Sequence, residues 1–87
     1  MRSPRAFDAL THAAVDAEII KAEVKHGTNN TPRSKEMTDP ERLVVLVEEV
    51  GEVARAITYD EGDKDALVGE LLQVAAMAMA WVEGLES

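Results

Sequence analysis

The chain has 87 residues, and its 17 aspartates and glutamates against 9 lysines and arginines give a formal net charge of -8 at pH 7. It contains no cysteine, which excludes disulfides, thiol catalysis and zinc or iron–sulfur sites built on cysteine. The negative charge argues against binding to duplex nucleic acid, because such affinity comes largely from Lys and Arg neutralising phosphates. An anionic substrate would therefore need a metal ion to mediate its binding.

The first residues give no sign of an export signal, because no apolar stretch follows the basic start Met1–Arg5. The longest nearly apolar stretch, 71–82, is shorter than the ~20 residues that span a bilayer. We therefore expect a cytoplasmic protein with no membrane partner.

The first predicted helix runs from about residue 8 to residue 25, where apolar residues recur every three or four positions. Gly27 ends it, and Lys25 and His26 suit the negative end of the helix dipole. Residues 27–38 contain turn-forming residues without any period, which predicts a loop.

The second predicted helix begins with Asp39 as N-cap and Pro40 in its first turn, and it continues to about Thr58. Residues 59–62 turn the chain, and Asp63 caps a third helix that runs to about Leu85. The sequence thus predicts a single all-α domain over residues 1–87, with three helices and an antiparallel hairpin between the last two.

Acidic residues interrupt an apolar stripe on each helix of this hairpin. At about 100° per residue, Glu49 and Glu52 fall on an otherwise apolar stripe rather than on the solvent face, and Glu70 and Gln73 do the same on the third helix. A hairpin that turns near residue 61 would place Glu52 opposite Glu70 and Glu49 opposite Gln73.

Ionised carboxylates in such a position cost several kcal/mol each unless they are paired or bind a metal ion. Few cations are near in sequence, since Arg55 lies on the solvent stripe and Lys64 in the turn. Oxygen ligands without cysteine favour Mg²⁺ or Mn²⁺ over zinc. The alternative is that these acids face solvent in an open array of three helices.

The segments 46–56 (LVEEVGEVARA) and 69–76 (GELLQVAA) resemble the MazG-type all-α nucleoside triphosphate pyrophosphohydrolases, whose signature is EExxE followed one helical hairpin later by ExxD. The similarity covers roughly residues 18–83. It implies cleavage of a nucleoside triphosphate between its α and β phosphates, which gives the monophosphate and pyrophosphate, with Mg²⁺ as cofactor.

The resemblance also implies roles for single residues. Glu49, Glu52 and Glu70 match the metal ligands of the family, and Glu48 matches the acid that orients or deprotonates the attacking water. Gln73 stands where the motif has Asp. Its amide oxygen can still bind a metal ion, but the site loses one negative charge. An inactive helical module that binds nucleotide or a protein partner is therefore the alternative to an enzyme.

The loop 27–38 offers candidates for substrate binding. Arg33 and Lys35 are placed to reach substrate phosphates, and Asn30 to hydrogen-bond a base or ribose. Solvated loop charges and turn formation explain the same residues without a ligand.

The third helix is apolar nearly all round over 71–82, so most of its sides must be buried. Three short helices leave it uncovered in a monomer, which predicts a second copy of the chain. The family resemblance likewise implies a dimer, or a tetramer of dimers, with four-helix-bundle packing and the active site near the subunit interface. The sequence does not indicate which base or sugar the nucleotide carries.

Overall fold

The computed structural model describes residues 4–59 and 62–86, which form three α-helices and no strand. α1 spans Ala9–His26, α2 spans Asp39–Thr58 and α3 spans Lys64–Glu86. The prediction of an all-α chain with three helices is confirmed. Two residues of the predicted turn at 59–62, residues 60 and 61, lie outside the described residues.

The helix ends follow from hydrogen bonding by the flanking residues. Gly27 caps the end of α1. Its φ of 89° is a conformation that glycine adopts readily, and its N–H donates to the Glu23 carbonyl at 2.9 Å. Before α3, the Asp63 carboxylate accepts the Asp65 N–H at 2.9 Å, as predicted for its cap.

The predicted cap of α2 was wrong by one residue. Thr38 is the N-cap: its hydroxyl accepts the Glu41 N–H at 3.3 Å, and the Glu41 carboxylate accepts the Thr38 N–H at 2.9 Å. This reciprocal capping box satisfies two backbone donors, which a single Asp39 cap would not do. Asp39 is then available for contacts with Arg42 and Trp81.

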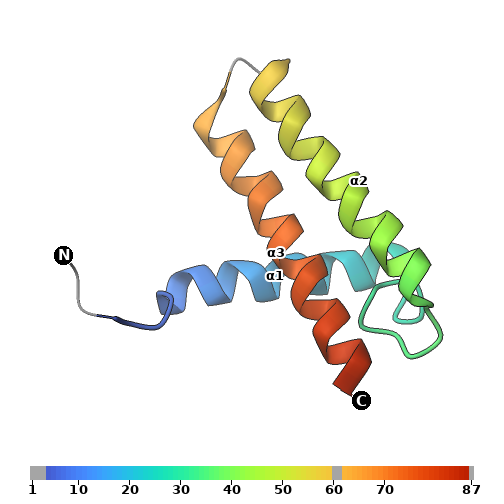
Figure 1. Cartoon of the computed structure of the whole chain (residues 1–87). Coiled ribbons are helices and arrows are strands. Elements are labelled where there is room, and N and C mark those ends of the chain that lie inside the picture. The colour runs from blue at the N-terminus through green and yellow to red at the C-terminus, as the bar shows by residue number, and fades with distance from the viewer. Residues whose placement is uncertain (1–3, 60–61, 87) are drawn as a thin grey trace.

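α2 and α3 run antiparallel as a hairpin, and α1 crosses behind it (Figure 1). α3 is the central element, because it packs on both α2 and α1. The buried core lies where α1 crosses α3 and consists of five apolar side chains: Val15, Ile19, Ala76, Met77 and Ala80. The crossing leaves both ends of the hairpin beyond the reach of α1.

A buried arginine holds the loop 27–38 in place. Arg42 is 5% exposed, and its guanidinium donates to the carbonyls of Pro32 at 2.9 Å and Ser34 at 2.7 Å. It also pairs with Asp39 at 2.9 Å, and the Arg42 and Trp81 hydrogen bonds lower the pKa of the Asp39 carboxyl. The loop is thereby fixed to the start of α2 and the end of α3.

The contact between the loop and the end of α3 requires a glycine at position 84. A Cβ on Gly84 would lie 2.6 Å from Arg42 Nη2 and would also overlap the Pro32 carbonyl oxygen. Gly84 therefore permits the close approach of the loop to α3.

Many large apolar side chains are exposed on the single chain. They include Val44, Val47, Val50 and Ile57 on α2 and Val68, Leu71, Met79, Val82 and Leu85 on α3. Monomeric proteins rarely expose so much contiguous apolar surface. By length and composition alone, α3 would also be able to cross a membrane, although the covered core helix of a folded domain passes the same test.

Candidate functional site

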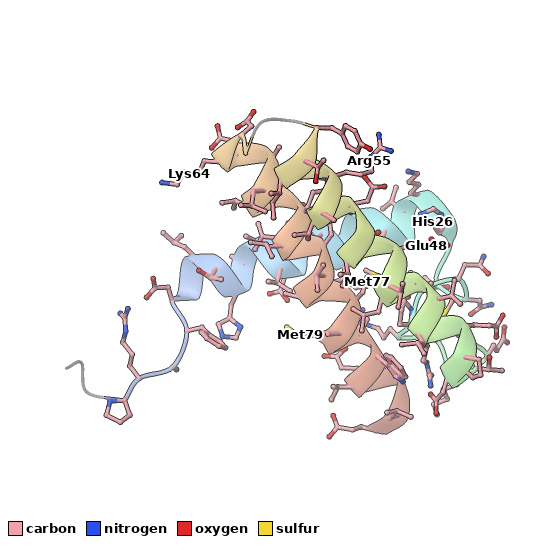
Figure 2. The ribbon with its side chains drawn as sticks, turned by 45° about the horizontal axis from the view of Figure 1, so that its top comes forward. His26, Glu48, Arg55, Lys64, Met77 and Met79 are labelled. Carbon is pink, nitrogen blue, oxygen red and sulfur yellow. The ribbon has the colours of Figure 1, made fainter. Side chains whose placement is uncertain are left out.

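A cleft of about 360 Å³ lies between the second half of α1 and the middle of α2, with α3 at its base. The loop closes one end with Asn30, Thr31 and Pro32. α2 contributes Glu48 and Glu49, and α3 contributes Gln73 and Met77. Figure 2 shows His26 at the end of α1 near Glu48 on α2, whereas Arg55 lies farther along α2.

Glu49 is the most unusual acid of the cleft. Its Oε2 atom is inaccessible to solvent and has no hydrogen-bond partner in the described part of the chain. Burial raises the pKa of the Glu49 carboxyl, and the negative charges of Glu70, Glu52, Glu48 and Glu18 raise it further. A buried oxygen without a partner, surrounded by like charge, is a position that a cation would stabilise.

The other predicted ligands differ in their exposure. Gln73 and Glu70 are half-buried on α3, and Gln73 lines the same cleft as Glu49. The Glu52 side chain is 53% exposed and lies 3.8 Å from the Arg55 guanidinium. The expectation that Glu52 avoids solvent was therefore wrong for the single chain, because α1 crosses the hairpin too far away to cover it.

Glu48 is exposed on the wall of the cleft, next in sequence to the half-buried Glu49. The two neighbouring acids therefore differ in environment: Glu48 is open to water and Glu49 is half-buried. The exposed carboxylate of Glu48 is open to water molecules in the cleft, as a general base that acts on water must be.

The donor set of the site fits a hard divalent cation. Carboxylate and amide oxygens are the ligands that Mg²⁺ and Mn²⁺ prefer, and Glu49 Oε2 is the buried acceptor that lacks a partner. Over residues 4–59 and 62–86, no three carboxylate or imidazole groups already converge as a metal site.

The opposite wall of the cleft, on α1, contains two lysines. α1 contributes Lys21, Lys25 and His26, together with Glu18, whose carboxylate is 3.5 Å from the Lys21 ammonium group. From the sequence, Lys25 and His26 are predicted to suit the end of the first helix, and Lys21 has no predicted role. The spacing of Lys21 and Lys25 could have indicated a shared role, because residues four apart lie on the same face of a helix.

The loop candidates separate into two groups. Asn30 lines the cleft, and its amide nitrogen donates to the His26 carbonyl at 2.7 Å. Arg33 lies elsewhere and pairs with Glu23 at 3.4 Å and Glu83 at 3.1 Å, thereby tying α1 to α3. Lys35 is exposed and is not among the residues that line the cleft.

No protein-family model matches this chain, and no curated protein or solved structure matches it.

Proposed function

We propose that the protein is a metal-dependent nucleotide pyrophosphohydrolase that cleaves a ribo- or deoxyribonucleoside triphosphate into the monophosphate and pyrophosphate. The observation that carries this proposal is Glu49, whose buried and unpartnered Oε2 atom lies in a cleft with the exposed acid Glu48 beside it. The order of acids in 48–52 and 70–73 supports it through the resemblance to MazG-type enzymes.

In this proposal Glu49, Glu52 and Glu70 hold Mg²⁺ or Mn²⁺, and the amide oxygen of Gln73 is a fourth ligand. When bound, the cation supplies positive charge that offsets the charge of the phosphates and of the acid cluster. A net charge of -8 makes such neutralisation necessary for an anionic substrate.

Glu48 is the proposed general base. Its exposed carboxylate accepts a proton from a water molecule whose oxygen attacks the α-phosphorus. The bond between the α-phosphorus and the bridging oxygen to the β-phosphorus breaks, and pyrophosphate leaves with the electron pair of that bond. The water oxygen remains on the nucleoside monophosphate.

Gln73 supports a second candidate function. It lines the cleft at the position where the motif has a carboxylate, so the acid cluster has one charge fewer. A helical module that binds nucleotide or a protein partner without turnover would retain the fold and the cleft but would not hydrolyse the nucleotide.

The same proposal includes assembly of the chain with itself, as a homodimer or a tetramer of dimers in the cytoplasm. The apolar side chains exposed along α2 and α3 support it. A four-helix-bundle arrangement would cover them with the same helices of a second copy.

A pyrophosphate-release screen over the common ribo- and deoxyribonucleoside triphosphates, with Mg²⁺ and with Mn²⁺, tests the enzymatic function. We expect release from at least one nucleotide, and we expect Glu48→Gln to lower the rate at least 100-fold, which is the lower range for loss of a general base. Lys64→Met is the control, because Lys64 is exposed at the start of α3 and lies outside the cleft lining. Absence of release from every nucleotide would favour the non-catalytic module.

A further inference from the structure

The polar residues that α1 contributes to the cleft are Glu18, Lys21, Lys25 and His26, and we call the two lysines, Lys21 and Lys25, the cationic wall. We infer that the cationic wall binds the β- and γ-phosphates of the substrate, the part that leaves as pyrophosphate. The inference rests on the proposed function for the identity of the nucleotide, but the affinity for pyrophosphate itself is a separate property of the cleft.

The distribution of charge in the cleft supports this assignment. The acids Glu48 and Glu49 lie on α2, whereas the two lysines lie on α1, where Glu18 is the one acid of the lining. A polyphosphate that enters between the walls meets ammonium groups on one side and the proposed metal-binding acids on the other. Since the whole chain has only 9 Lys and Arg residues, two lysines on one wall of one cleft are a notable concentration of positive charge.

The electrostatics of the helix end do not by themselves account for the two lysines. Positive side chains near a helix C-terminus offset the dipole and the free carbonyls, but two of these carbonyls already have other partners. The Gly27 N–H donates to the Glu23 carbonyl at 2.9 Å, and the Asn30 amide donates to the His26 carbonyl at 2.7 Å. Lys21 lies more than one turn before the helix end, where the dipole effect has faded.

The lysines are also available for a ligand. Within residues 4–59 and 62–86, Lys25 has no ion pair or side-chain hydrogen bond. Lys21 has one ion pair, a 3.5 Å contact with Glu18 in which the lysine side chain is 73% exposed. An exposed contact of this kind is worth little, so it would be exchanged readily for a phosphate.

The loop end of the cleft provides a second, independent observation. Thr31 lines the cleft and is 2% exposed, yet its hydroxyl has no hydrogen-bond partner in the described part of the chain. Buried polar atoms are nearly always hydrogen-bonded, so an unpaired one indicates a missing partner. Thr31 and Glu49 thus place two unpaired polar atoms at the same cleft, as expected where a polar ligand belongs.

Buried hydrogen bonds hold the loop beside the proposed phosphate site in place. Arg42 donates to the carbonyls of Pro32 and Ser34, which fixes the loop on either side of residue 33. The position of Thr31 beside the cationic wall is therefore set by buried hydrogen bonds. This geometry predicts that the cleft discriminates by phosphate number, with triphosphates and pyrophosphate bound more tightly than monophosphates.

The test is isothermal titration calorimetry of the full chain with inorganic pyrophosphate, with and without Mg²⁺. The variants are Lys21→Met, Lys25→Met and the double variant, and the control is Lys64→Met, which removes the same charge from an exposed position at the start of α3, outside the cleft lining. We expect the double variant to lose at least 10-fold in affinity and the control to stay within 2-fold, because removal of two phosphate contacts outweighs a change in net charge. Circular dichroism melting curves confirm that each variant is folded.

The salt dependence of the wild-type affinity is a readout that needs no variant. Contacts between ammonium groups and phosphate weaken as salt is added, so we expect pyrophosphate affinity to fall steeply between low and physiological salt. A double variant that matches Lys64→Met, an affinity that does not respond to salt, or a wild-type chain that does not bind pyrophosphate would each overturn the inference. Pyrophosphate binding without turnover of any nucleotide would contradict the proposed enzymatic function and support the inference.

Discussion

Glu49 is partly buried and lies near other carboxylates, and both features lower the stability of the fold when no metal ion is bound. Both effects raise the pKa of Glu49 above its ordinary value of 4.5, so the folded state disfavours the ionised form. The ionised carboxylate then destabilises the fold at neutral pH, and this cost begins to fall as the pH drops below the raised pKa and is gone below the ordinary value of 4.5. Glu49→Gln removes the charge and keeps the shape of the side chain.

We predict that Glu49→Gln melts at a higher temperature than the wild type in the presence of a chelator at pH 7. The difference should shrink as the pH is lowered toward 4.5, the ordinary value for Glu49. Adding Mg²⁺ should raise the melting temperature of the wild type but not that of the variant. Glu48→Gln is the control, since its carboxylate is exposed. Equal melting temperatures for Glu49→Gln and wild type across this pH range would contradict the prediction.

At Gln73 a negative charge can be added, whereas Glu49→Gln removes one. Gln73→Asp should tighten binding of Mg²⁺, because it completes the four-acid motif near Glu49. Without metal we expect it to lose about 1–3 kcal/mol of stability through repulsion by Glu49 in a partly buried site. Millimolar Mg²⁺ should reduce or reverse this loss. Melting temperatures of both proteins with and without Mg²⁺ measure the effect, and an identical response to Mg²⁺ would show that residue 73 does not face the metal.

At the scale of elements, the contact between the loop 27–38 and the end of α3 depends on one glycine. Gly84→Ala places a methyl group against Arg42 and the Pro32 carbonyl, so either the loop or the arginine must shift. We predict a loss of about 1–3 kcal/mol, the usual cost of overpacking, which lowers the melting temperature by about 4–8 °C per kcal/mol in a chain of this size.

The matched control is Gly51→Ala, because a Cβ at Gly51 meets no atom within 4 Å. Alanine has the higher helix propensity, so this variant should gain stability. The comparison is made by thermal unfolding with a chelator present. If Gly84→Ala were as stable as Gly51→Ala, the loop would not be anchored at the end of α3.

The helices could be predicted from the sequence because their signals are local. Apolar periodicity, Gly27 and Asp63 act within one or two turns, and the structure places the helix ends within a residue of the predicted positions. The position of α1 depends instead on packing of Val15 and Ile19 against α3, which no local signal specifies.

Two features of the site depend on how α1 crosses α3. Lys21 and Lys25 line the cleft only because α1 passes across α3 at this angle, and Glu52 is exposed for the same reason. The burial of Arg42 was equally unpredictable, because arginine early in a helix normally faces solvent. Its carbonyl partners come from a loop whose path has no periodic signal.

At the scale of the whole molecule, the exposed apolar surface predicts self-association. Leu71 is 50% exposed, Val82 54% and Leu85 61%, although α3 is the most apolar helix of the chain. Burying these side chains against a second copy would contribute about 25 cal/mol for each Å² removed from water. We predict a dimer or tetramer by multi-angle light scattering at low micromolar concentration. A stable monomer under these conditions would contradict the prediction.

The position of bond cleavage tests the central claim most directly. A nucleoside triphosphate that turns over in the pyrophosphate-release screen is incubated with the protein and Mg²⁺, and the products are followed by ³¹P NMR. We predict equal amounts of nucleoside monophosphate and inorganic pyrophosphate, and neither product with Glu49→Gln. Nucleoside diphosphate with orthophosphate, or equal rates for wild type and Glu49→Gln, would contradict a pyrophosphohydrolase site in the cleft between α1 and α2.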